Sequence, residues 1–118
     1  MRAMTSAAGS LARTGYDVLL DFSIPPAFPP TAQKILRDAR LHYIVLRPPL
    51  EVCAARARDR AEGKIAKYDR GFYAAFAAEE RHAVAPDDSE SPKAIADVTC
   101  KGLAEGHFRV GPDAIAPL

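Results

Sequence analysis

This 118-residue sequence has no apolar run near the roughly 18–20 residues that a membrane span requires, because Pro, Arg or Asp interrupts every candidate. Charge of one sign is also lacking: the formal net charge is +1, which gives no electrostatic reason to expect nucleic acid or an anionic membrane as partner. The first 15 residues lack the strong apolar block of a signal peptide. We therefore expect no membrane or nucleic-acid partner and a cytoplasmic location.

Cysteine is scarce, and the two cysteines do not form a CxxC motif. Cys53 and Cys100 fall inside predicted helices, so we expect small buried residues in a reducing compartment rather than a disulfide framework or a metal site. Hydrophobic residues make up 48% and charged residues 26%, which is typical of a soluble globular chain. The length predicts a single domain over residues 1–118.

Helices and strands are predicted to alternate along most of the chain. The first three predicted helices cover 3–14, about 30–39 and 49 to about 62, and Gly15 and Gly63 end the first and the third of them. A fourth helix is predicted from Asp69. A fifth begins with Ser91 as N-cap and Pro92 at its first position, and it stops at Gly106. The predicted strands are "YDVLLD" (16–21), "HYIVL" (42–46), "RHAVAP" (81–86) and "HFRV" (107–110). This order predicts an α/β fold, a parallel sheet with helices on both faces.

Asp21 is the first candidate for chemistry, because it ends the apolar run of its strand. In an open parallel sheet, ligands bind outside the carboxyl ends of the strands. A carboxylate there could hold Mg²⁺ through a water or accept a proton from a substrate hydroxyl. The alternative is that Asp21 only caps the backbone of the following loop.

The second candidate is the pair Arg56 and Arg60, which lie four residues apart on a predicted helix, with Arg58 towards the opposite edge. Two guanidinium groups on one ridge suit a polyphosphate, because each binds oxygens in a bidentate manner and stays charged. The alternative is a solvated face on which Arg56 pairs with acids such as Asp59.

Aromatic residues and histidines complete the candidates. An aromatic group on a predicted helix could wall a pocket for a ring, although its helical spacing favours a place in the core: Phe72, Tyr73 and Phe76. The three histidines each begin a strand, in a spacing that favours the edge of the core over a metal site: His42, His82 and His107.

Taken in order, three stretches resemble the later two-thirds of the P-loop kinase-like nucleotide-binding fold: "GYDVLLD" (15–21), "HYIVLRPPLEVCAARARDR" (42–60) and residues 81–110. The similarity is to the small phosphotransferases and AAA-labelled ATP-binding proteins around zeta-toxins, chloramphenicol phosphotransferase and shikimate kinase. The resemblance implies a three-layer domain with ATP and Mg²⁺ as cofactors. It places Asp21 near Mg²⁺ and the phosphate acceptor, Arg56 and Arg60 opposite the transferred phosphate, and Asp87 and Ser89 at the border of the adenine pocket.

One motif of that family is absent, the phosphate loop G-x-x-x-x-G-K-[ST]. Its backbone amides and Lys hold the phosphates, and its Ser or Thr holds Mg²⁺. We expect the chain to begin after the first strand, the phosphate loop and the second strand. It is therefore expected to be a remnant or fragment of an ATP-dependent small-molecule phosphotransferase, catalytically competent only if a phosphate loop is supplied upstream.

Two other functions remain open at this stage. One is a non-catalytic binding or assembly module that keeps the fold, and the other is a toxin-like kinase fragment acting on a nucleotide sugar. In the family's sheet the first strand lies between the strands represented here by 16–21 and 42–46, so its removal leaves two unpaired edges. We expect these two strands to pair directly, or a homodimer to complete the sheet.

Overall fold

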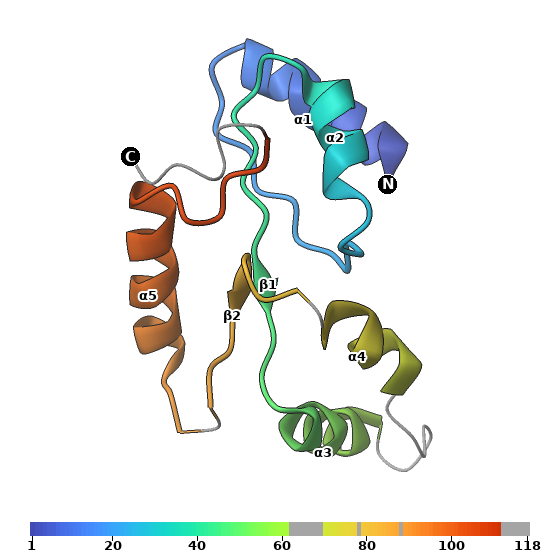
Figure 1. Cartoon of the computed structure of the whole chain (residues 1–118), viewed down its shortest axis with the longest axis vertical. Helices are drawn as coiled ribbons and strands as arrows, with labels where there is room; N and C mark the ends of the chain where they lie inside the picture. The colour runs from blue at the N-terminus through green and yellow to red at the C-terminus, as the bar shows by residue number, and fades with distance from the viewer. Residues whose placement is uncertain (62–69, 78, 88, 112–118) are drawn as a thin grey trace.

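The computed structural model describes residues 1–61, 70–77, 79–87 and 89–111 (Figure 1). In these ranges the chain forms helices and two very short strands. The helices are α1 (Arg2–Arg13), α2 (Pro29–Leu36), α3 (Leu50–Ala61), α4 (Arg70–Ala77) and α5 (Pro92–Ala104), and the strands are β1 (Val45–Leu46) and β2 (Ala83–Val84). The helix and strand content fits the α/β class. No helix among the described residues is both long and apolar enough to cross a bilayer.

An extended central segment, residues 41–47, connects the two ends of the molecule and contains β1. β1 pairs in parallel with β2, with Val45 opposite Ala83. Towards its start, the central segment forms an antiparallel bridge between His42 and Arg109. The predicted strands 42–46 and 81–86 therefore exist in shortened form and are parallel, whereas the predicted strand 107–110 is reduced to this bridge.

All of these backbone pairs lie on one edge of the central segment. The amides of Tyr43, Val45 and Arg47 donate to the carbonyls of Phe108, His82 and Val84 over 2.9, 2.9 and 2.8 Å, and the amide of Val110 donates to the carbonyl of Leu41 over 2.9 Å. Alternate residues of an extended chain direct their amides to the same side. The even-numbered residues 42, 44 and 46 therefore face the other edge, where no backbone hydrogen bond forms within the described residues.

Small residues allow α1 and α2 to pack closely in the upper part of Figure 1. Ala8 and Thr5 of α1 and Ala32 and Leu36 of α2 are buried. A Cβ atom at Gly9 would lie only 3.2 Å from Leu36 Cδ2, so glycine permits this contact. Gly15, with φ +96°, follows the end of α1, as the sequence predicts.

Phe108 anchors α5 to the rest of the fold. Its side chain is 2% exposed, and its ring occupies the space that a side chain at Gly102 would need. The helix begins as predicted, because the Ser91 Oγ accepts a hydrogen bond from the Ala94 amide over 3.1 Å. Gly106, with φ +73°, follows its end.

Two side chains attach α4 to the chain around β1. Arg47 Nη1 donates to the Phe76 carbonyl over 2.9 Å, near the C-terminus of α4. Tyr73 Oη donates to the Pro48 carbonyl over 2.9 Å. Tyr73 and Phe76 are half-buried, so the expected aromatic group contributes to packing here, whereas the side chain of Phe72 lies outside the described structure.

The predicted strand 16–21 does not form, and this prediction is wrong. These residues are irregular, with Tyr16 66% and Leu19 87% exposed. A strand requires a neighbouring strand to pair its backbone, and no backbone hydrogen bond joins this run to another extended segment among the described residues. The direct pairing of 16–21 with 42–46 is therefore also absent.

Other boundaries differ from the prediction. The second helix ends at Leu36 rather than near 39, because Arg37 takes a positive φ of 46°. Cys53 is half-buried, whereas Cys100 is exposed, contrary to the expectation of a buried residue; both are free thiols. The helix stop at Gly63 and the N-cap at Asp69 lie outside the described residues.

Candidate functional site

The structure does not bring Asp21 together with the two arginines. Asp21 is exposed and lies in the coil between α1 and α2, which occupies the upper half of the molecule in Figure 1. Arg56 and Arg60 are exposed on α3 at the lower end. The roles of Asp21, Arg56 and Arg60 at a nucleotide site stay predictions.

Asp87 and Ser89 form a local turn. Asp87 Oδ1 accepts hydrogen bonds from the backbone amide of Ser89 over 2.7 Å and of Glu90 over 3.1 Å, and from the Ser89 hydroxyl. The hydrogen bond from the Ser89 side chain is the main cause that lowers the pKa of Asp87, and the backbone hydrogen bonds add to it. In this arrangement the carboxylate organises its own loop.

Two of the histidines have ordinary structural partners. His82 Nδ1 lies 2.9 Å from Glu79 Oε1, and its ring meets Tyr43 edge to face at 5.5 Å between centroids. His107 is exposed and its ring packs at right angles to Phe108. Both agree with histidines at the edge of the core. The described residues contain no cluster of three or more His, Cys, Asp or Glu that could hold a metal ion.

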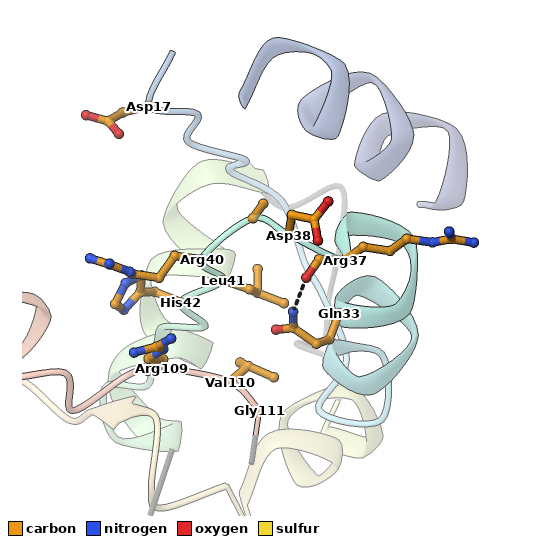
Figure 2. A pocket seen from close by; sticks show the side chains of 11 residues that line it. Asp17, Gln33, Arg37, Asp38, Arg40, Leu41, His42, Arg109, Val110 and Gly111 are labelled. Carbon is orange, nitrogen blue, oxygen red and sulfur yellow. Dashed lines mark hydrogen bonds between the residues drawn. The ribbon is translucent and has the colours of Figure 1, made fainter. Parts of the chain in front are cut away.

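His42 differs, because it lines a cavity of about 690 Å³ (Figure 2). One wall is formed by Gln33 of α2 and the turn 37–42, and the other by residues 109–111, with Asp17 at the rim. The positive φ of Arg37 ends α2 and directs the chain into the turn. The bridge between His42 and Arg109 then joins the two walls.

Three basic side chains lie on the same side of this cavity. Figure 2 shows Arg40, His42 and Arg109 next to each other, while the Arg37 side chain extends away from them. Residues opposite each other in an antiparallel bridge carry neighbouring side chains, which explains why His42 and Arg109 meet. Burial lowers the pKa of His42, and the positive charges of Arg109 and Arg40 lower it further.

No carboxylate neutralises the cluster within the part of the chain that the structure describes. Neither Arg40 nor Arg109 forms an ion pair there. Asp17 and Asp38 belong to the cavity lining, but Figure 2 shows both carboxylates apart from the His42 ring. Among the described residues, the basic side of the cavity therefore has no neutralising partner, and the two acids of the lining, Asp17 and Asp38, lie apart from it.

Two buried polar atoms of the cavity lack a hydrogen-bond partner among the described residues, His42 Nδ1 and Gln33 Oε1. The Gln33 side chain uses only its Nε2, which donates to the Arg37 carbonyl over 3.5 Å. Gly111, at φ +124°, lies close to Gln33 Oε1 and leaves that side of the cavity without a side chain. Buried polar groups are normally satisfied, so both atoms mark places where a ligand could bond.

Sequence reasoning missed this cavity. It assigned His42 to the edge of the core and gave Arg40 and Arg109 no role. One sequence pattern could have indicated it: basic residues stand two positions apart in "RLH" (40–42) and in "HFR" (107–109). In an extended chain, residues two positions apart lie on the same face.

Comparisons of this chain with protein-family models, with curated proteins and with solved structures found no significant match.

Proposed function

We propose that this chain is a non-catalytic assembly module whose central segment pairs with a second copy along its open edge. The observation that carries the proposal is the one-sided pairing of residues 41–47: one edge is filled by residues from 82–84 and 108–110, and the other forms no backbone hydrogen bond within the described part of the chain. Proteins rarely leave the edge of a sheet unprotected, because its free amides and carbonyls recruit another strand.

Exposed apolar surface supports a second copy as the partner. Leu46 is 59% exposed on the central segment, and Tyr16 and Leu19 are uncovered in the coil after α1.

Two-fold symmetry defines the pairing that this edge would make. The two central segments would run antiparallel, with Ile44 opposite Ile44 of the other copy and His42 opposite Leu46. Because residues 42, 44 and 46 all direct their backbone groups to the open edge, about six hydrogen bonds could form. Pro48 and Pro49 would end the ladder, since they lack amide protons.

Two substitutions of opposite charge at Leu46 test the register of this dimer. Leu46→Lys would place a cation near Arg40 and Arg109, which flank His42 of the other copy, and should weaken dimerisation about tenfold or more, whereas Leu46→Glu should keep it. Val98→Lys on α5 is the matched control, because Val98 is also exposed, at 55%, and lies outside the central segment. Sedimentation equilibrium measures the dissociation constant of each variant. A wild-type chain that stays monomeric at high concentration, or equal weakening by Val98→Lys, would refute the assembly module.

The phosphotransferase fragment is the second candidate function, and one observation favours it. β1 and β2 are parallel and are linked through α3 and α4, and Arg56 and Arg60 lie on the helix directly after β1. In this interpretation the chain belongs to a P-loop kinase-like three-layer domain, works in the cytoplasm and uses ATP and Mg²⁺, with Asp21 near the metal.

Thermal unfolding with and without Mg²⁺ and ATP tests this second function. A ligand that binds only the folded state raises the melting temperature. A rise that Arg60→Ala removes, while Arg58→Ala does not, would support the nucleotide site. No rise at millimolar ATP would leave the assembly module as the function.

A further inference from the structure

The positive side of the cavity holds charges that none of the described residues compensates. Like-charged residues opposite each other in an antiparallel pair destabilise the pair, and His42 and Arg109 are such a pair whenever the histidine is protonated. Arg40 adds a third basic group on the same side (Figure 2). An anion between these side chains would remove the repulsion and satisfy their donors.

We propose that Arg40, His42 and Arg109 bind the phosphate group of a small hydroxyl-bearing phosphate monoester. Each guanidinium can donate two parallel hydrogen bonds to phosphate oxygens, and His42 Nδ1, which has no partner among the described residues, can donate a further one. The cavity volume of about 690 Å³ falls within the range of small-molecule sites.

The other side of the cavity restricts what the phosphate can be attached to. Gln33 Oε1 is buried, lacks a partner among the described residues and can only accept a hydrogen bond, so a hydroxyl group of the ligand would suit it. Asp17 and Asp38 also line the cavity and repel further negative charge. A single phosphate with hydroxyl groups beyond it satisfies these conditions, whereas a polyphosphate or a nucleic acid strand does not. This site lies away from Arg56 and Arg60, and it shares His42 with the proposed dimer edge.

Calorimetric titration with inorganic phosphate at low ionic strength tests the site. We expect Arg40→Gln and Arg109→Gln each to weaken phosphate binding roughly 10–100-fold, the loss associated with a charged hydrogen bond. Arg58→Gln on α3 is the matched control, since it removes an exposed arginine outside the cavity and should leave binding unchanged. Far-UV circular dichroism verifies that each variant is folded. No phosphate binding by the wild-type chain, or an equal loss in Arg58→Gln, would overturn the proposal.

Acetate separates a phosphate site from a general anion site. Phosphate should bind at least tenfold more tightly, because a dianion with more than two acceptor oxygens engages both guanidinium groups and the imidazole together. Acetate binding as tight as phosphate binding would overturn the assignment to phosphate. A hydroxyl-bearing monoester such as glycerol phosphate should bind more tightly than inorganic phosphate, and this gain should disappear in Gln33→Leu.

The pH dependence of sulfate binding isolates the contribution of His42, because sulfate keeps its charge between about pH 5 and 8 while histidine titrates. The charged groups around His42 are Arg40 and Arg109 beside it and Asp17 and Asp38 across the cavity. A bound dianion opposes the two arginines and favours the protonated imidazole, so sulfate affinity should rise as the pH falls. The rise should vanish in His42→Gln. A flat profile in the wild-type chain would remove His42 from the site and overturn the three-residue arrangement.

Discussion

Gly102 lies on the face of α5 that meets Phe108, and Gly102→Ala would place a methyl group inside the space of the phenyl ring. The new Cβ would be 2.5 Å from Phe108 Cε2 and 2.8 Å from Cζ, much closer than carbon atoms approach. Phe108 is 2% exposed, so a displaced ring would press on the atoms that surround it, and its carbonyl accepts a hydrogen bond from the amide of Tyr43 in the central segment.

The two opposing contributions to Gly102→Ala have different sizes. Alanine favours a helix over glycine by about 1 kcal/mol. Overpacking costs about 1–3 kcal/mol, and displacing a buried phenylalanine approaches the 3–5 kcal/mol of its deletion. We therefore expect a net destabilisation of about 1–3 kcal/mol, which corresponds to a fall in melting temperature of at least about 4 °C.

Gly9→Ala provides the matched control, since it makes the same exchange inside α1. Its Cβ would lie 3.2 Å from Leu36 Cδ2 and 3.3 Å from Arg13 Nη1, both at the ends of side chains that can shift. The helical preference of alanine should then roughly balance the contact, and stability should change by less than about 0.5 kcal/mol. Urea unfolding followed by circular dichroism compares the two variants. A Gly102→Ala protein as stable as the wild type would refute the packing of Phe108 against α5.

Three further predictions concern individual side chains. Burial, and to a lesser degree the charge of Glu79, raises the pKa of Tyr43 to about 12, so between pH 10 and 12 the unfolded chain loses a proton that the folded chain keeps. Unfolding free energy should therefore fall by about 2 kcal/mol over this range relative to Tyr43→Phe, and parallel urea curves would contradict this. Ser91→Ala should destabilise the chain by about 1 kcal/mol through loss of the α5 N-cap, measured by thermal unfolding. In Ser89→Ala the lowered pKa of Asp87 should return towards its ordinary value in an NMR titration, and no change would exclude the Ser89 hydroxyl as its cause.

The candidate site was only partly accessible to sequence reasoning, because its members come from distant parts of the chain. Asp21, Arg56 and Arg60 could be selected from local patterns, but the structure leaves the coil and α3 at different ends of the molecule. The proposed phosphate site joins Arg40 and Arg109, which are 69 positions apart in the sequence. Only the backbone bridge between His42 and Arg109 shows that these side chains are neighbours.

The sequence by itself determined the presence of the helices and the ends of α1 and α5, because these depend on nearby residues. Ser91 and Pro92 begin α5, Gly15 and Gly106 follow the ends of α1 and α5, and the described helix positions agree with the apolar spacing. Tertiary structure decided which apolar runs become strands. Residues 42–46 acquire partners in 82–84 and 108–110, whereas the apolar run 16–21 has no strand partner in the described ranges and stays irregular. A strand is stable only when a neighbour satisfies its backbone hydrogen bonds, and that neighbour is chosen by the fold and not by the strand's own residues.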